Sequence, residues 1–363
     1  MADGVTTEST IEPVAEAMAH ARLAAARLAH QTTDLFLPPD SRLSDRQRSL
    51  WMNLLLGLLD SLEVSLRQGM IEASREVPGH HAEQRHVIGE FPRFAARHVH
   101  DDGPTLRDPQ LVEMIRRRAE EHRMALKLGS RNGADPADDI VIRLIRSSDP
   151  EISRLTMAML VAESRRLDRF REPMLHVADL PADIAEEMVW WTAAALRTHL
   201  HAQIENVDAL LVPAARRLIS ERDDMQNDEA DALAVVLRLG ENEELDDQFL
   251  IDALCSGRIG LFVSGLAVRG GVTRGLVWML LESPSAGFAR YLKAVGIARE
   301  AAVRLLVEIA SLADEVVGRS APDSIGTAIG HYDELEPSEG RRMLDYWRTD
   351  SALRKAVEGP PWS

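Results

Sequence analysis

The chain has 363 residues, of which 45% are hydrophobic, 28% are charged and only 4% are aromatic. This balance is typical of a globular protein, and the length allows one large core or two smaller ones. The formal net charge of -16 disfavours long-range attraction to nucleic acid or to an anionic membrane. Cys255 is the single cysteine, which excludes an internal disulfide and a thiolate metal cage. We therefore expect a soluble protein of the reducing cytoplasm, with no nucleic-acid and no membrane partner.

The N-terminal residues 1–40 are predicted to form a tail and a first helix. Ser44 and Gln47 have the spacing of a capping box, in which each side chain reaches the backbone of the other residue. The long helix predicted behind this box carries an apolar stripe at helical spacing, formed by Leu50, Leu54, Leu58, Leu62 and Leu66. Glu63 and Arg67 lie off the stripe and four residues apart, so we interpret them as an ion pair on a solvated helix face.

Further helix starts are predicted where aspartate or serine precedes proline. Aspartate caps the free N–H groups of a helix, and proline is already set for its first turn. The four pairs are Asp108-Pro109, Asp135-Pro136, Asp149-Pro150 and Ser283-Pro284. Apolar residues recur at helical spacing behind the aspartate pairs, and the connections are short. This organisation predicts an all-α fold, as an irregular HEAT-like helical solenoid or a multi-helix array.

The domain organisation follows from the same pattern. We expect the tail and first helix at 1–40, a HEAT-like helical region at 41–240, and a C-terminal helical subdomain at 241–357. The segment 259–268 is apolar and rich in β-branched residues, so a strand is conceivable there. Because no partner strand is evident nearby, a buried helix is favoured.

The common catalytic motifs are absent from the sequence. It contains no G-x-S-x-G elbow, no phosphate-binding P-loop, no dinucleotide fingerprint and no H-E-x-x-H zinc motif. No cofactor and no catalytic residue is therefore predicted. The segment 80–100 is rich in histidine, and Glu83 and His86 have a spacing that can place both on one helix face. A polar helix and loop is the favoured interpretation, and a metal site built on these residues is the alternative.

Two groups of residues are candidates for binding. Trp190 and Trp191 are adjacent on a predicted helix and diverge by about 100° around it, so at most one of them can lie at the centre of a narrow buried stripe. Either the stripe is wide or one indole lies at its edge. Packing in the core or at its edge is the favoured interpretation for this pair, and contact with a protein partner, for which an exposed tryptophan is a good anchor, is the alternative. Arg258, Arg269 and Arg274 are basic residues in an acidic chain, and their guanidinium groups could contact an anionic ligand. Pairing with aspartate or glutamate inside the protein is the favoured interpretation for these arginines.

A family resemblance emerges in the C-terminal third. The residues that carry it are LCSG at 254–257, LAVRGGV at 266–272, FARYLKA at 288–294, YD at 332–333 and WRTD at 347–350. Their order resembles the alphaproteobacterial family known as domain of unknown function 2336, over about residues 40–357. The segment 80–239 departs most from that family. The resemblance implies an all-helical fold in a bacterial cytosol, and it implies no reaction and no catalytic residues.

Three hypotheses for function follow. The first is a non-enzymatic helical scaffold or regulatory module that binds another protein. The second is a sensor of a small molecule or anion, held by arginines in a helical pocket. The third is a metal-dependent enzyme that uses the histidine-rich segment 80–100.

Overall fold

The computed structural model describes residues 45–75, 82–90, 104–131, 139–224, 228–282, 286–312 and 321–349. Within these ranges the chain forms α-helices and short 3-10 turns and contains no strand. An isolated bridge joins Leu167 and Pro173 in the loop that follows α6. The prediction of an all-α fold is therefore confirmed for the described part of the chain.

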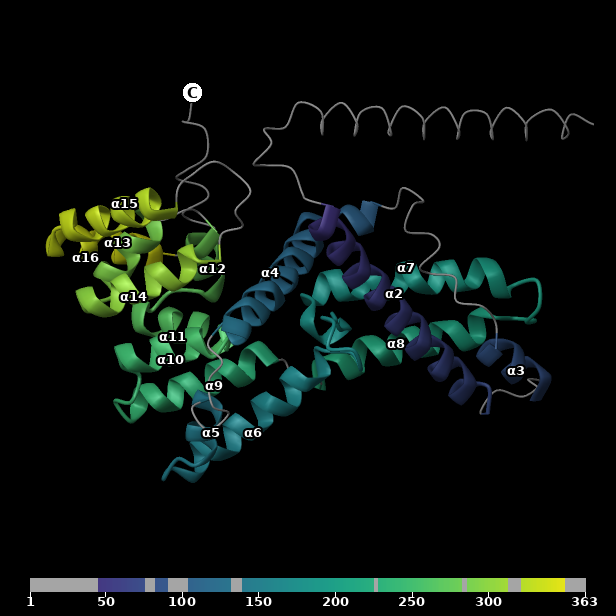
Figure 1. Cartoon of the computed structure of the whole chain (residues 1–363). Helices are drawn as coiled ribbons and strands as arrows, with labels where there is room; N and C mark the ends of the chain where they lie inside the picture. Colours follow the sequence, from purple (N-terminus) through teal and green to yellow (C-terminus); the bar gives the residue numbers. More distant parts are fainter. Residues whose placement is uncertain are drawn as a thin grey trace, which may run out of the picture.

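The helices fall into two runs along the chain (Figure 1). The first run comprises α2 (Asp45–Ala73), α3 (Ala82–Glu90), η4 (Pro104–Arg107), α4 (Pro109–Arg131), α5 (Ile140–Ile145), α6 (Pro150–Arg165), η6 (Val177–Asp179), α7 (Ala182–Leu200) and α8 (Asp208–Asp224). The second run comprises α9 (Asp228–Glu241), α10 (Asp247–Cys255), α11 (Ile259–Gly270), α12 (Arg274–Glu282), α13 (Ala286–Ala294), α14 (Arg299–Ala310), α15 (Ala321–Glu334) and α16 (Pro337–Arg348). The segment 259–268 lies inside α11, so the prediction of a buried helix there is confirmed.

The buried apolar residues of the described chain form two clusters. One cluster joins α2, α7 and α8 with the first half of α4. The other joins the second half of α4 with α5, α6 and α9 to α16. In Figure 1, α4 runs between the two groups of helices, and its own residues enter both cores. The second cluster takes in residues of α5, α6 and α9 as well as those of the helices after residue 241.

The leucine stripe predicted at 50–66 lies on α2. Leu58 and Leu66 are fully buried, and α2 packs against α8, α4 and α7. Gly69 allows a close approach to α8, since a Cβ there would lie 2.9 Å from the Cβ of Ala214. By length and composition alone, α2 could cross a membrane. Its leucine stripe packs inside the protein, in the first of the two clusters.

The interpretation of Glu63 and Arg67 as a solvated pair is wrong. The Glu63 side chain is 0% exposed and that of Arg67 is 7% exposed. The Nε and Nη2 atoms of Arg67 donate to Glu63 Oε1 over 2.9 and 2.6 Å. Its Nη1 donates to the carbonyl of Ile88 over 2.6 Å, which joins α2 to α3. Spacing along one helix could not show that another helix covers this face.

The predicted helix starts at Asp108 and Asp149 are confirmed. Asp108 Oδ1 accepts from the backbone N–H of Gln110 over 2.7 Å at the start of α4, and Asp149 caps α6. The starts at Asp135 and Ser283 lie outside the described residues, as do the cap at Ser44 and the segment 1–40. The cap of α5 is Asp139, whose side chain accepts from the N–H of Val141.

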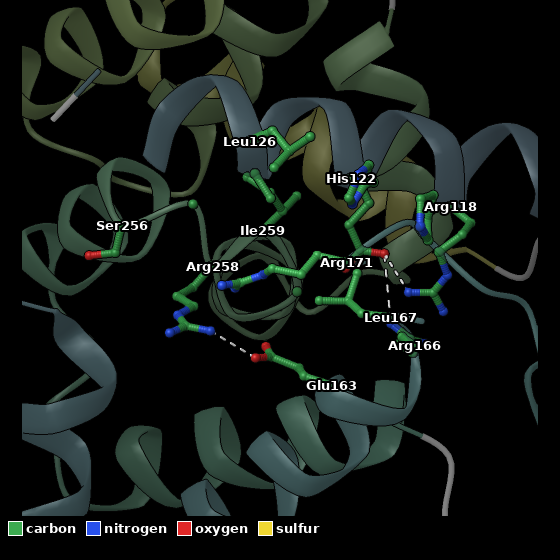
Figure 2. A pocket seen from close by; sticks show the side chains of 15 residues that line it. Arg118, His122, Leu126, Glu163, Arg166, Leu167, Arg171, Ser256, Arg258 and Ile259 are labelled. Atoms are coloured by element: carbon green, nitrogen blue, oxygen red, sulfur yellow. Dashed lines mark hydrogen bonds and ion pairs between the residues drawn. The ribbon is translucent and has the colours of Figure 1, made fainter. Parts of the chain in front are cut away.

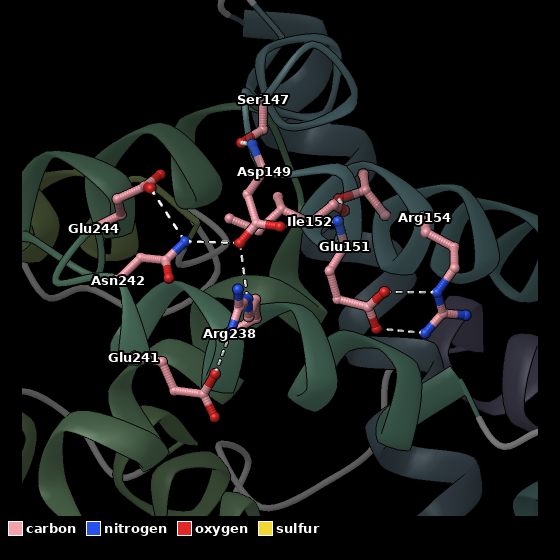
Figure 3. Close-up of polar contacts among 10 residues, drawn as sticks. Ser147, Asp149, Glu151, Ile152, Arg154, Arg238, Glu241, Asn242 and Glu244 are labelled. Carbon is pink, nitrogen blue, oxygen red and sulfur yellow. Dashed lines mark hydrogen bonds and ion pairs between the residues drawn. The ribbon is translucent and has the colours of Figure 1, made fainter.

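Asp149 also joins two helices (Figure 3). Its Oδ2 accepts from Asn242 Nδ2 over 3.0 Å and from Arg238 Nε over 2.8 Å, at the end of α9. The pKa of this carboxyl is lowered to about 2, because the Asn242 amide, the N–H of Glu151 and the Arg238 guanidinium all favour the charged form. A helix cap predicted from local sequence therefore also holds α6 against α9.

Candidate functional site

A pocket of about 280 Å³ opens between α4, the loop that follows α6, and the turn between α10 and α11. Figure 2 shows charged side chains from all three elements converging on it. The charged and polar lining residues are Arg118, Glu121, His122, Glu163, Arg166, Arg171, Ser256 and Arg258. The apolar lining residues are Ala125, Leu126, Leu167, Pro173 and Ile259. We call this the arginine pocket.

Gly257 shapes one side of the arginine pocket. The turn after α10 is closed by bonds from the N–H of Gly257 to Leu254 and from the N–H of Arg258 to Ala253, over 2.9 and 2.8 Å. Gly257 has a φ of +70°, and a Cβ there would lie 2.8 Å from the carbonyl oxygen of Ala125 on α4. Only glycine allows this backbone to lie so close to α4, and the contact places Arg258 at the pocket.

The loop at 166–173 shapes the opposite side. Asp168 Oδ1 accepts from the N–H groups of Phe170 and Glu172 over 2.7 and 2.8 Å, and the chain turns back at this point. Arg171 has a φ of 65°, an uncommon conformation for a residue with a side chain. The turn organised by Asp168 places the Arg171 side chain in the pocket, as Figure 2 shows.

A cluster of paired charges forms the wall between α4 and this loop. Arg118 Nη1 donates to Glu121 Oε2 over 3.4 Å, and Arg166 Nη2 donates to Asp179 Oδ1 over 3.3 Å. Cross pairs of 3.7 Å join Arg118 to Asp179 and Arg166 to Glu121. Both arginine side chains are at most 9% exposed. The four charges balance, so this wall is close to neutral.

The local pKa shifts fit this arrangement. Burial by itself would raise the pKa of the Glu121 carboxyl, but the guanidinium groups of Arg118, Arg166 and Arg274 outweigh it and lower the pKa. Glu121 therefore stays ionised. Burial lowers the pKa of His122, so its imidazole is neutral at neutral pH and adds no charge to the pocket.

The other two arginines of the pocket differ from each other. Arg258 donates from Nη1 to Glu163 Oε2 over 2.9 Å and from Nη2 to Asp139 Oδ2 over 2.7 Å. Arg171 forms no ion pair and no side-chain hydrogen bond with any residue in the described ranges, and it is exposed. Arg171 is thus the cation of the pocket that no carboxylate of the described ranges contacts directly.

The family model for uncharacterised proteins conserved in bacteria, domain of unknown function 2336, matches residues 134–345. The chain belongs to this family. No curated protein and no solved structure matches the chain. The matched range contains the loop at 166–173 and the α10–α11 turn, while Arg118 and Glu121 on α4 precede it. The resemblance in the C-terminal third therefore identified the right family, and the match does not address the alphaproteobacterial branch.

The three predicted arginines do not share one site in this family member. Arg258 lines the arginine pocket. Arg269 pairs with Asp247, and Arg274 Nη1 donates to Ser264 Oγ over 2.8 Å. Neither of the last two lines the pocket. Arg258 and Arg269 thus pair with acidic residues inside the protein, which is the interpretation favoured from the sequence.

Sequence reasoning missed the other arginines of the pocket. Arg118 lies in the run RRRAEEHR of α4, where alternating charges are typical of a solvated helix face. Arg166 and Arg171 lie in a loop with no recognisable motif. The tight turn signalled by Asp168 was the one local feature that could have drawn attention to Arg171.

Trp190 and Trp191 lie at the edge of the first core. Both side chains are half-buried and pack against the cluster formed by α2, α7 and α8. They border an open depression together with Glu186 and Glu187, which are exposed. We call these four residues the α7 surface.

The histidine-rich segment lies mostly outside the described residues. His80, His81, His98 and His100 are not described, and His86 is exposed on α3. Among the described residues, no group of three or more histidine, cysteine, aspartate or glutamate side chains could hold a metal ion. The metal-dependent alternative for the segment 80–100 stays a prediction.

Proposed function

We propose that this protein is a non-enzymatic scaffold or regulatory module that binds another protein through the α7 surface. The observation that supports it is the placement of Trp190 and Trp191 beside Glu186 and Glu187. Two indoles at the edge of a core supply apolar contact area without being needed at the core centre. The absence of the common catalytic motifs from the sequence favours binding over catalysis.

The chemistry of the α7 surface favours a partner that presents a basic segment. Lysine and arginine side chains are attracted to the face of an indole and to carboxylates. Asp183 is exposed one turn before Glu186 and Glu187 on the same helix, so it adds to the negative charge there. The net charge of -16 attracts a basic partner from a distance.

A pull-down from a native lysate with two variants of the α7 surface tests the proposal. Trp191→Ala removes an aromatic anchor, and Glu187→Gln removes a charge from an exposed position without affecting the core. Both are expected to lose a stoichiometric partner that the wild type retains. Val161→Ala on α6 and Glu300→Gln on α14 also alter exposed residues and serve as matched controls that retain the partner.

A photoreactive crosslinker distinguishes the α7 surface from other contacts. Ala194 is exposed one turn beyond the tryptophans, and a crosslinker there is expected to label a basic segment of the partner. The same crosslinker at Val161 is expected to label none. The proposal fails if no partner is retained, if Glu187→Gln retains it fully, or if the labelled segment is not basic.

Three finer statements belong to this proposal. Neighbouring helices of the chain pack against one another, as α5 with α6, α7 with α8 and α10 with α11 do, which supports a HEAT-like arrangement. A single cysteine supports a cytoplasmic location. The resemblance at 254–272 supports an alphaproteobacterial origin within the family.

A further inference from the structure

We propose that the arginine pocket binds a small organic acid with one carboxylate and an apolar body. The cavity volume of about 280 Å³ sets the size of the ligand. The pocket and the α7 surface lie on different helices, so this site is independent of the proposed protein contact.

The four arginines of the pocket and the four carboxylates around them balance overall, but direct pairing leaves one guanidinium group, that of Arg171, available to a single ligand carboxylate. Arg118 and Arg166 are neutralised by Glu121 and Asp179, and Arg258 is paired with Glu163 and Asp139. Arg171 alone has no such partner in the described ranges. A single carboxylate can accept two parallel hydrogen bonds from its guanidinium group, the preferred geometry for this pair of groups.

Arg171 from the loop and Arg258 from the α10–α11 turn approach the pocket from opposite sides (Figure 2). Both Nη atoms of Arg258 are engaged by carboxylates, and its Nε is buried away from the pocket space. Arg171 is therefore the guanidinium group that a ligand carboxylate can reach.

A dianion such as a phosphate ester fits the pocket less well. Glu121 and Glu163 lie in the lining, and Glu121 is held ionised. A second negative charge would face these carboxylates with no further unpaired arginine from the described chain to offset it. Like charges at close range in a partly buried site are costly, so the pocket favours a monoanion.

The rest of the lining supplies an apolar wall for the body of the ligand. Leu126 on α4 is 55% exposed although it is large and hydrophobic. It lies beside Ala125 and Ile259, with Leu167 and Pro173 on the loop. Covering Leu126 removes apolar surface from water, which is favourable. An apolar body next to a single carboxylate therefore matches both parts of the site.

Isothermal titration calorimetry with three probes of one shape tests the ligand class. Benzoate carries one carboxylate on an apolar ring, benzamide is its neutral analogue, and phenyl phosphate is a dianion at pH 8. Benzoate is expected to bind, and the other two are expected to bind at least about tenfold more weakly. Equal binding of benzamide or tighter binding of phenyl phosphate overturns the proposal, as does the absence of benzoate binding at millimolar concentration.

Three variants locate the binding to the pocket. Arg171→Gln is expected to weaken benzoate binding about tenfold or more, because it removes a charged hydrogen-bond donor. Arg169→Gln removes the same charge two residues earlier, at an exposed position that does not line the pocket, and is expected to leave binding unchanged. Leu126→Glu places a carboxylate at the exposed wall and is expected to abolish binding. Equal effects of Arg171→Gln and Arg169→Gln would overturn the assignment to this pocket.

Discussion

The buried pair of Glu63 and Arg67 gives the sharpest test of the packing described above. Arg67→Met keeps most of the side-chain volume and removes the guanidinium group. The Glu63 carboxylate, 0% exposed, then loses both hydrogen bonds from this arginine. The contact from α2 to the Ile88 carbonyl on α3 is lost as well. Removing one partner of a buried ion pair typically costs about 3–5 kcal/mol, and we expect a cost of that size.

The assay is urea denaturation followed by far-UV circular dichroism, with a matched pair as control. Glu151 and Arg154 on α6 form a similar bidentate contact over 2.9 and 2.6 Å. Their side chains are 46% and 64% exposed, so solvent screens the pair. Arg154→Met is therefore expected to leave the urea midpoint unchanged within error.

A double variant separates charge burial from loss of packing. In Glu63→Leu/Arg67→Met no carboxylate is left buried without its arginine, so the double variant is expected to be more stable than Arg67→Met alone. The reasoning is refuted if Arg67→Met costs no more than Arg154→Met. It is also refuted if the loss of unfolding free energy in the double variant equals the sum of the losses in Glu63→Leu and Arg67→Met, since the two charges would then not interact.

Three further predictions concern single residues. Gly257→Ala is expected to destabilise more than Gly296→Ala: both positions have positive φ, a penalty of about 1 kcal/mol, but only at 257 would a Cβ meet another atom, the Ala125 oxygen at 2.8 Å. Equal urea midpoints would contradict the contact with α4. Asp149→Ala is expected to lower stability at pH 7. Because the folded pKa is about 2 against an ordinary 3.8, this contribution is complete above about pH 4 and is lost as the pH falls through about 2. Thermal melts of variant and wild type should therefore converge at acid pH. Tyr291→Phe is expected to cost about 1 kcal/mol, because the buried hydroxyl donates to a carbonyl of α11 over 2.7 Å; an unchanged urea midpoint would argue against that bond.

The local features of the fold were accessible from the sequence because they depend on residues a few positions apart. The Asp-Pro pairs at Asp108 and Asp149 marked true helix starts, since a cap is made by a side chain and the N–H groups directly after it. The leucine stripe of α2 repeats with the period of the helix, so it identified the buried face.

The same local reasoning failed where burial depends on a distant element. Glu63 and Arg67 have the spacing of a surface pair, and so do Glu151 and Arg154. The difference is that α3 covers the first pair and nothing in the described chain covers the second. Spacing predicts that two side chains can meet, while solvent exposure depends on what packs over them.

The all-α class, the helix starts at Asp108 and Asp149 and the family could be inferred from the sequence alone. Helix caps mark the starts, apolar periodicity indicates the fold class, and short sequence segments identify the family. Each of these signals spans only a few neighbouring positions. The tertiary structure alone decided where charge is buried and where the arginine pocket lies. Arg258 meets Asp139 across 119 residues of sequence, and Arg118 and Arg171 come from separate elements. No local pattern specifies these contacts between residues distant in sequence, because the contacts depend on how the helices pack around the two cores.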